Sequence, residues 1–188
     1  MLPTRKPMRR RSTPRSLRST DACPAGRRPY LCPVPNDTAY ERPLTPPECA
    51  LARSMFGDAI DLDPVRIRLR KWWPLQPRRV TMAPRGHIHF HPEGTSYCDC
   101  FGEGTLAGQG LFLHEMTHVW QHQSGTNLIL RRHPFCRYDY IFETGKPFAR
   151  YGIEQQAEIV RHTYLMRRGH VVPGKPPLEE LEAILPFG

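Results

Sequence analysis

The sequence predicts an α+β fold in which a small N-terminal sheet is followed by two main helices. Apolar residues and arginines alternate with period two in "VRIRLR" (65–70), which is typical of a half-buried strand. In residues 110–123 and 151–168, helix-favouring composition and apolar side chains at three- and four-residue intervals indicate helices. With 188 residues, 39% of them hydrophobic, the chain can bury one core of modest size, so we expect one domain.

The first helix is predicted over residues 46–56 by the signals at its two ends. Thr45 is a candidate N-cap, Pro46 takes the first helical position, and Glu48 stands three residues after the cap, as in a capping box. Gly57 provides the stop signal.

Two further extended runs flank the turn-forming tripeptide Pro84-Arg85-Gly86 and predict a hairpin or a close strand pair. The polar, glycine-rich residues 92–109 are expected to form a loop that leads into the helix at 110–123. Residues 126–150 show no clear period. Gly169 ends the helix at 151–168, and "PPLEELEAIL" predicts a short last helix.

The net charge of +9 is concentrated at the N-terminus, where residues 1–20 carry seven Lys or Arg and no acid. We expect residues 1–44 to be a disordered basic leader and a proline-rich extended segment, and residues 45–188 to be the domain. A phosphate-binding arm or a wrongly assigned start codon are the alternatives for the leader. The remainder is nearly neutral, which argues against nucleic-acid binding. No secretory signal or membrane-spanning run is found, so we expect a soluble protein.

The even number of cysteines permits up to three disulfides in an oxidising compartment, with bridges among the first three as one option and reduced thiols as the other. The pairing cannot be read from the sequence. The cysteines are Cys23, Cys32, Cys49, Cys98, Cys100 and Cys136.

The motif H-E-x-x-H at residues 114–118 predicts a zinc site. Positions i and i+4 share one face of a helix, so His114 and His118 can reach one Zn²⁺ while Glu115 lies beside the ion as a general base. His122 cannot share the ion with His114, because eight residues place them roughly 12 Å apart along the axis. We expect His122 to be a surface residue or to support a ligand from behind.

A catalytic zinc requires a third protein ligand, and the helix at 151–168 offers two carboxylates four residues apart. We assign Glu154 to the metal and Glu158 to orienting a ligand histidine, although the two roles could be exchanged. The alternative for this pair is an ordinary solvated face, on which Glu158 would pair with Arg161.

Four side chains are candidates for the donor that stabilises a tetrahedral oxyanion, and the sequence does not choose among them. They are Tyr138, Tyr140, Tyr151 and His162. The alternating His87, His89 and His91 could line a cleft or a second metal site, but an exposed face is the interpretation we favour.

Two segments, "LHEMTHVWQHQ" and "YGIEQQAEIVR", resemble the Vgr-related proteins and the zinc metallopeptidase domains attached to VgrG and Rhs proteins of type VI secretion systems. The resemblance covers residues 45–170, including "GDAIDLDPVRIR" and "MAPRGHIHFHP". It implies a zincin-like, gluzincin metallopeptidase fold with His114 and His118 as ligands, Glu115 as base and a glutamate of the later helix as third ligand. Some relatives look like antibacterial toxins that act in the periplasm of a rival cell.

We therefore expect a zinc metallopeptidase that hydrolyses peptide bonds of a peptide or protein substrate, as an effector or accessory of a type VI secretion system. The expected location is the bacterial cytoplasm at synthesis, followed by export to the periplasm of target cells. A secretion-spike protein or an immunity protein is an expected partner. The alternative is a non-catalytic accessory or assembly protein of the secretion apparatus that contains zinc.

Overall fold

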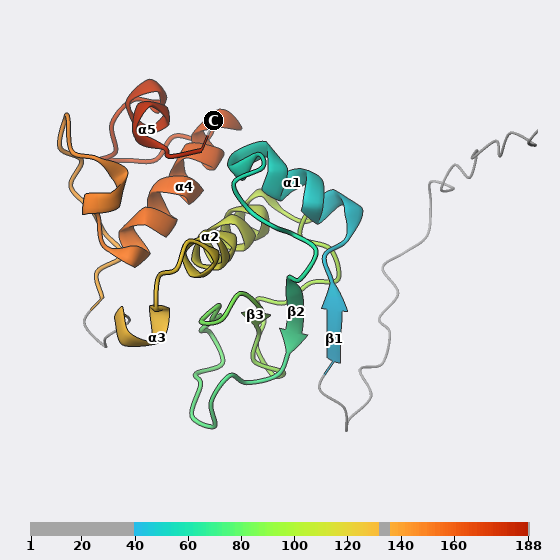
Figure 1. Ribbon diagram of the computed structural model, residues 1–188. Coiled ribbons are helices and arrows are strands. Elements are labelled where there is room, and N and C mark those ends of the chain that lie inside the picture. The colour runs from blue at the N-terminus through green and yellow to red at the C-terminus, as the bar shows by residue number, and fades with distance from the viewer. Residues whose placement is uncertain (1–39, 132–135, 188) are drawn as a thin grey trace, which may run out of the picture. The chain divides into compact units, whose positions relative to one another are not determined.

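The computed structural model describes residues 40–131 and 136–187, which form a mixed α+β fold with a three-stranded sheet (Figure 1). The elements are β1 (Tyr40–Pro43), α1 (Pro46–Phe56), β2 (Arg66–Leu69), β3 (Ile88–His89), α2 (Leu106–Gln123), α3 (Leu128–Arg131), the 3₁₀ turn η1 (Phe148–Arg150), α4 (Ile153–Arg167) and α5 (Leu178–Ile184). All the described residues belong to one compact unit. In this part of the chain, no helix combines the length and the apolar character that crossing a membrane requires.

The sheet has the order β1-β2-β3, with β1 antiparallel and β3 parallel to β2. Tyr40–Pro43, which the sequence analysis placed in the extended segment before the domain, pairs with β2 as an edge strand. The sequence "YERP" shows no apolar alternation that would predict a strand. It pairs through backbone hydrogen bonds, and this pairing depends little on the identity of the side chains. Pro43 is tolerated because it ends an edge strand. The rest of the predicted leader, residues 1–39, lies outside the described residues.

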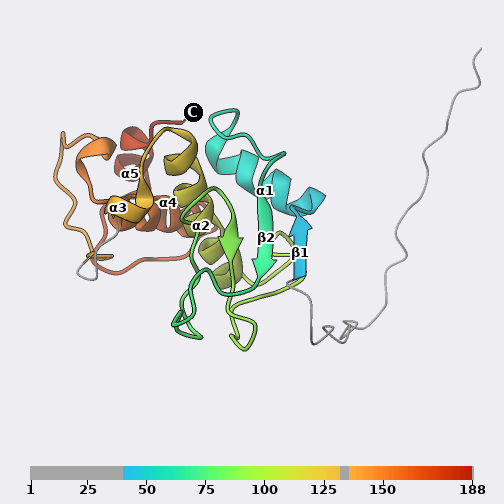
Figure 2. The same ribbon diagram turned by 60° about the horizontal axis from the view of Figure 1, so that its bottom comes forward.

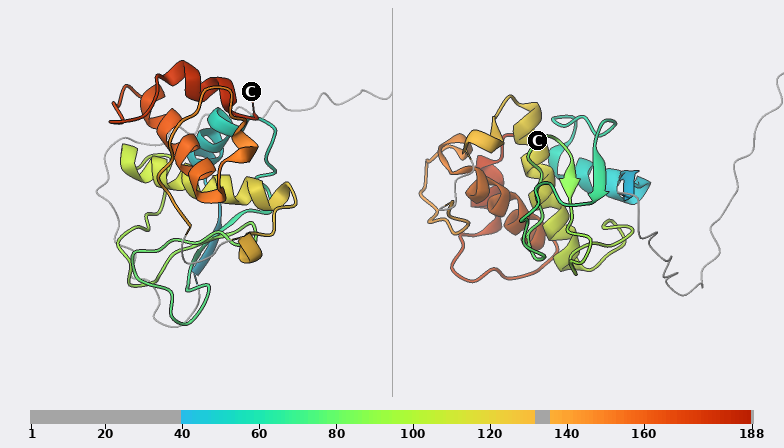
Figure 3. Two further views of the ribbon diagram at one scale, coloured as in Figure 1. Left: turned by 90° about the vertical axis from the view of Figure 1, so that its left-hand side faces the viewer. Right: turned by 90° about the horizontal axis from the view of Figure 1, so that it is seen from below.

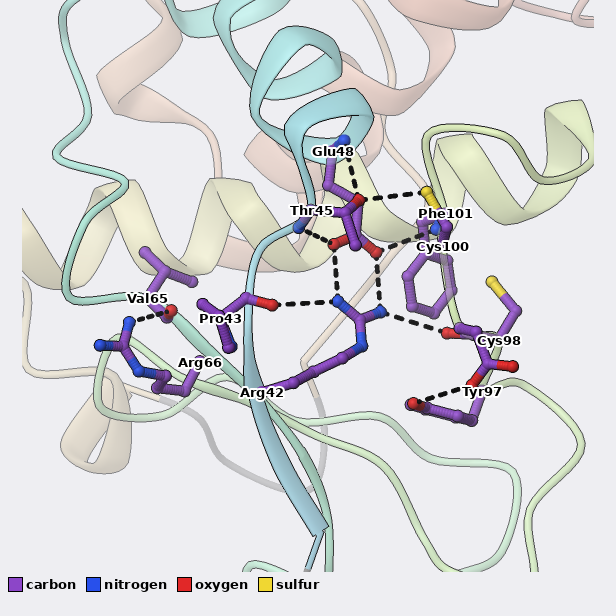
Figure 4. A network of polar contacts seen from close by, with 11 residues as sticks. Arg42, Pro43, Thr45, Glu48, Val65, Arg66, Tyr97, Cys98, Cys100 and Phe101 are labelled. Carbon is purple, nitrogen blue, oxygen red and sulfur yellow. Dashed lines mark hydrogen bonds and ion pairs between the residues drawn. The ribbon is translucent and has the colours of Figure 1, made fainter. Parts of the chain in front are cut away.

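Helix α1 confirms the predicted capping box and adds a second role for its glutamate. Thr45 caps the backbone of Glu48, and Glu48 caps the backbone of Thr45. The Glu48 carboxylate is fully buried and also accepts hydrogen bonds from Arg42 of β1, at 2.7 and 2.9 Å, and from the backbone N–H of Phe101, at 2.9 Å (Figure 4). Burial would raise the pKa of Glu48, but these donors hold the pKa below its usual value. One carboxylate therefore joins β1, α1 and the loop before α2.

Helix α2 begins at Leu106, four residues before the predicted start. The glycine-rich composition of residues 92–109 suggested a loop, but the Thr105 side chain accepts a hydrogen bond from the Gly108 N–H and caps the helix. Gly110 has a packing reason, since a Cβ there would lie 3.3 Å from the Arg161 side chain of α4. Close packing of α2 on α4 offsets the weak helix propensity of these glycines.

Helix α2 forms the centre of the fold, with the sheet and α1 on one side and α4 with α5 on the other (Figure 2). Helix α4 crosses α2, as the left view of Figure 3 shows. Side chains of both helices enter a common core that includes Leu113, Met116, Ile159 and Val160. The helices predicted at 151–168 and within 176–185 are confirmed as α4 and α5.

The predicted strand pair around Pro84-Arg85-Gly86 is confirmed as one antiparallel bridge, in which Met82 and His89 exchange two backbone hydrogen bonds of 3.1 and 2.8 Å. The exposed histidine face that we favoured is wrong for His89 and His91, which are buried. His89 packs edge-on against Trp72, and burial lowers the pKa of its ring to about 4.

The predicted disulfide bridges involving Cys23 or Cys32 lie outside the described residues. Cys49, Cys98, Cys100 and Cys136 carry free thiols.

Candidate metal centre

Three buried side chains converge where α4 begins beside the middle of α2. The Nε2 atoms of His114 and His118 lie 3.3 and 3.1 Å from the same carboxylate oxygen, Oε2 of Glu154. The three potential ligand atoms lie within 4.8 Å of one another. Glu154 stands in the first turn of α4, where the helix dipole favours a negative charge. The fold therefore joins the two halves of the predicted site.

The tautomer of His118 is set by a glutamine that the sequence analysis did not single out. The amide nitrogen of Gln121 donates to the carbonyl of Ile153 at 3.0 Å and to the side chain of Gln156 at 2.8 Å. The Gln121 oxygen is therefore the atom that lies 2.9 Å from His118 Nδ1, and it can only accept. His118 consequently carries its proton on Nδ1 and directs the lone pair of Nε2 toward Glu154.

The tautomer of His114 is set in the same way by Glu158, whose carboxylate oxygen lies 2.9 Å from Nδ1 of His114. A carboxylate can only accept, so the proton of a neutral His114 resides on Nδ1 and Nε2 again presents a lone pair. Nε2 of His162 contacts the second carboxylate oxygen of Glu158 at 3.2 Å, and Arg161 contacts the same oxygen as His114, at 3.3 Å. The hydroxyl of Tyr140 lies 3.0 Å from Nδ1 of His162 and orients that ring in turn.

The electrostatics of this cluster favour positive charge. Burial alone would lower the pKa of His114, but the carboxylates of Glu154 and Glu158 raise it to about 9. Burial would raise the pKa of Glu158, whereas its contacts with His114 and His162 hold that pKa well below its usual range. A site that stabilises a proton among two imidazoles and two carboxylates offers the same stabilisation to a metal cation.

Two cavities flank the three converging groups. A polar cavity of about 260 Å³ is bordered by Glu115, His114 and Tyr138, together with Thr81 and Arg161. An apolar cavity of about 130 Å³ lies beside His118 and Glu154 and is otherwise lined by Trp72, Met82, Ala83, Pro84, Leu128, Ile129 and Ile153. Residues 79–84 border both cavities in turn, so one segment runs past the cluster from the polar to the apolar side.

Among the four oxyanion candidates, Tyr138 is the one that borders the cavity of Glu115. Its ring stacks on His114 with centroids 6.0 Å apart, and 46% of its surface is exposed. The Tyr140 hydroxyl and His162 bond to each other behind Glu158, away from this cavity. The Tyr151 hydroxyl accepts a hydrogen bond from the backbone N–H of Glu143.

Of the two expected placements of His122, at the surface or behind a ligand, the structure has the first. Its side chain is exposed and packs near Gly86, where a Cβ would lie 3.0 Å from the ring. The residue that holds His118 is the neighbouring Gln121. Gln121 could have been found from the sequence, because positions 118 and 121 lie three apart on the same helical face.

Comparison with known proteins identifies relatives of this chain, although no family model matches it. The chain is 43% identical over 137 residues to the type VI secretion system spike protein VgrG2b of Pseudomonas aeruginosa, a match that covers 69% of this chain and 13% of that protein. The solved effector domain of Pseudomonas aeruginosa VgrG2b superimposes with a TM-score of 0.63 at 36% identity, covering 76% of this chain and 80% of the domain. The predicted relationship to Vgr-related proteins is confirmed, and the chain belongs to the family of VgrG2b effector domains.

Proposed function

We propose that this chain is a zinc metallopeptidase with a zincin-like fold. The observation that carries the proposal is the orientation of His114 and His118. Their Nδ1 atoms are both held by acceptors, so both Nε2 atoms meet the Glu154 carboxylate and each can offer a lone pair to a metal ion once its proton is released. Two imidazole nitrogens and one carboxylate oxygen are a ligand set of catalytic zinc sites, which keep a fourth position open. The buried residues present therefore fit Zn²⁺, held by His114, His118 and Glu154.

The other residues of the cluster fit peptide hydrolysis. When bound, Zn²⁺ would polarise the scissile carbonyl and lower the pKa of a water molecule. Glu115 borders the polar cavity, where it can take the proton of the attacking water and pass it to the amine released when the C–N bond breaks. Tyr138 borders the same cavity and can donate to the carbonyl oxygen as negative charge develops on it. The apolar cavity can accept an apolar side chain of the substrate.

We further propose that the enzyme is a type VI secretion effector that acts on a peptide or protein in the target cell. The support is the match to the effector domain of a spike protein. The matched region spans 13% of the spike protein, so its delivery route and partners extend to this chain as part of the proposal. A spike component and a protective inhibitor are the partners that such a role requires.

The test combines metal analysis with a single charge-removing substitution. We expect purified protein to bind one equivalent of Zn²⁺, and Glu115→Gln to retain the metal while losing about 10²- to 10⁴-fold in cleavage of an unfolded protein substrate. Glu179→Gln, at an exposed position of α5, is the matched control. Expression of the three proteins in the cytoplasm and in the periplasm of a bacterial host would locate any toxicity.

Two results would contradict the proposal. Absence of stoichiometric zinc would remove the metal centre. Stoichiometric zinc with cleavage and toxicity unaffected by Glu115→Gln would remove the catalytic role and favour the alternative of a non-catalytic accessory protein.

A further inference from the structure

Positive charge is concentrated in one stretch of the described residues. Residues 64–92, which include β2, β3 and the connection between them, contain no Asp or Glu. Their cations are Arg66, Arg68, Arg70, Lys71, Arg78, Arg79 and Arg85. Glu41 and Glu93 pair with Arg68 and Arg78 from outside the stretch, and the second of these pairs is exposed and therefore weak. Residues 64–92 are thus strongly basic, although the domain as a whole is nearly neutral.

The connection begins with a loop of defined shape, residues 71–79, which we call the tryptophan loop. Gln76 is buried at its base, where its side chain accepts a hydrogen bond from the Trp72 N–H at 2.7 Å and donates one to the Val80 carbonyl at 2.7 Å. Trp72 turns inward against His89. The loop extends past the ends of the strands at the lower edge of Figure 1.

The tip of the tryptophan loop exposes apolar side chains to water. Trp73 is 43% exposed and Leu75 is 75% exposed. Gln76, the next residue in the loop, is buried. Arg70, Lys71 and Arg79 are exposed at the two ends of the loop. Apolar side chains at a fixed tip with cations around its base are complementary to a surface that is negatively charged outside and apolar beneath.

We propose that the tryptophan loop is a docking site for an anionic lipid bilayer. Tryptophan prefers the boundary between headgroups and hydrocarbon, leucine enters the hydrocarbon, and each nearby cation adds attraction to anionic headgroups. Nucleic acid would attract the same cations and could stack on Trp73, but it offers no apolar layer for Leu75. The bilayer is therefore the partner that uses all three features.

Docking in this way would place the two cavities at the candidate metal centre beside the membrane. Trp72 borders the apolar cavity and Arg79 borders the polar one, so the two ends of the tryptophan loop lead to the two sides of the metal centre. This consequence for substrate access rests on the proposed function, whereas the docking itself does not.

Vesicle flotation of the full chain tests the proposal without any activity measurement. The probes are vesicles of phosphatidylcholine alone and of phosphatidylcholine mixed with phosphatidylglycerol. The variant W73S/L75S removes the apolar tip, and I141S/V171S removes two side chains of equal or greater exposure, 81% and 78%, elsewhere on the surface. All variants keep the basic residues 1–20, so any contribution from these residues is constant.

We expect salt-sensitive binding of the unchanged protein to the phosphatidylglycerol vesicles and quenching of its tryptophan fluorescence by brominated lipids. W73S/L75S should bind about tenfold or more weakly than I141S/V171S, and R70E/K71E should also weaken binding. Thermal unfolding of each variant checks that it folds, and the quenching of the unchanged protein provides evidence that needs no variant.

Three outcomes would overturn the proposal. The first is no binding to phosphatidylglycerol vesicles. The second is equal binding by W73S/L75S and I141S/V171S, which would assign the binding to another part of the chain. The third is a tighter complex with an oligonucleotide that W73S/L75S weakens, which would assign the loop to nucleic acid.

Discussion

Two buried glutamates, Glu48 beside the sheet and Glu154 beside α2, are 0% and 1% exposed but have opposite surroundings. The carboxylate of Glu48 receives two hydrogen bonds from Arg42 and others from backbone N–H groups (Figure 4). The carboxylate of Glu154 faces the Nε2 atoms of His114 and His118, at 3.3 and 3.1 Å. A guanidinium, which is always charged, therefore balances Glu48, whereas Glu154 is grouped with two imidazoles that can give up a proton to bind a metal ion.

We interpret the difference as separating a structural role, for Glu48, from the proposed metal-binding role of Glu154. A buried carboxylate with a complete set of donors holds elements together, and its charge is balanced within the fold. A buried carboxylate grouped with imidazoles can exchange their proton for a metal ion, which the same carboxylate then stabilises. Burial and charge alone would not distinguish these two glutamates, but their neighbours do.

The largest expected effect is the loss of stability when Glu48 is truncated. Glu48→Ala leaves the largely buried Arg42 guanidinium without its carboxylate, so we expect the free energy of unfolding to fall by about 3–5 kcal/mol. Denaturant unfolding measures this loss, and Glu103→Ala, at an exposed position, is the control. A change below about 1 kcal/mol would show that the network in Figure 4 does not stabilise the fold.

The next effect concerns zinc affinity and separates the two acids of α4. Glu154→Gln should weaken zinc binding more than about 100-fold, whereas Glu158→Gln, which acts through His114, should weaken it about 10- to 100-fold. Competition with a chelator measures both affinities. A larger loss in Glu158→Gln than in Glu154→Gln would exchange the two roles.

The smallest expected effect concerns His89, a third buried ionisable side chain, and the pH dependence of stability. The pKa of His89 is lowered to about 4 in the folded protein, so between pH 6.5 and 4 the unfolded chain binds a proton that the folded protein does not. Stability contributed by the neutral ring is therefore complete above pH 6.5 and decreases as the pH falls toward 4. We expect His89→Gln to reduce this pH-dependent loss by about 1–2 kcal/mol, discounted for partial solvent screening. Equal pH dependence of the two unfolding free energies would contradict this assignment.

The predictions from sequence succeeded where neighbouring residues decide the outcome. Thr45 and Glu48 lie three apart, and their capping box formed as predicted. The alternation in "VRIRLR" placed β2, and the spacing of His114 and His118 placed both imidazoles on one face of α2. Helical and extended geometry relate residues a few positions apart, so these features follow from the local sequence.

Other features were decided by packing between distant segments. The pairing of Tyr40–Pro43 with β2 has no signal in its own four residues. The burial of His89 depends on Trp72, which precedes it by a loop.

The candidate metal centre divides in the same way. The sequence by itself determined that a helix would carry two imidazoles and a carboxylate at metal-binding spacing, and that a later helix would offer two acids. Only the tertiary structure brought Oε2 of Glu154 to both Nε2 atoms, and Gln121 and Glu158 to the opposite ring nitrogens. The physical reason is that hydrogen bonds between α2 and α4 depend on how closely the two helices cross, and that distance is set by the packing of their whole interface.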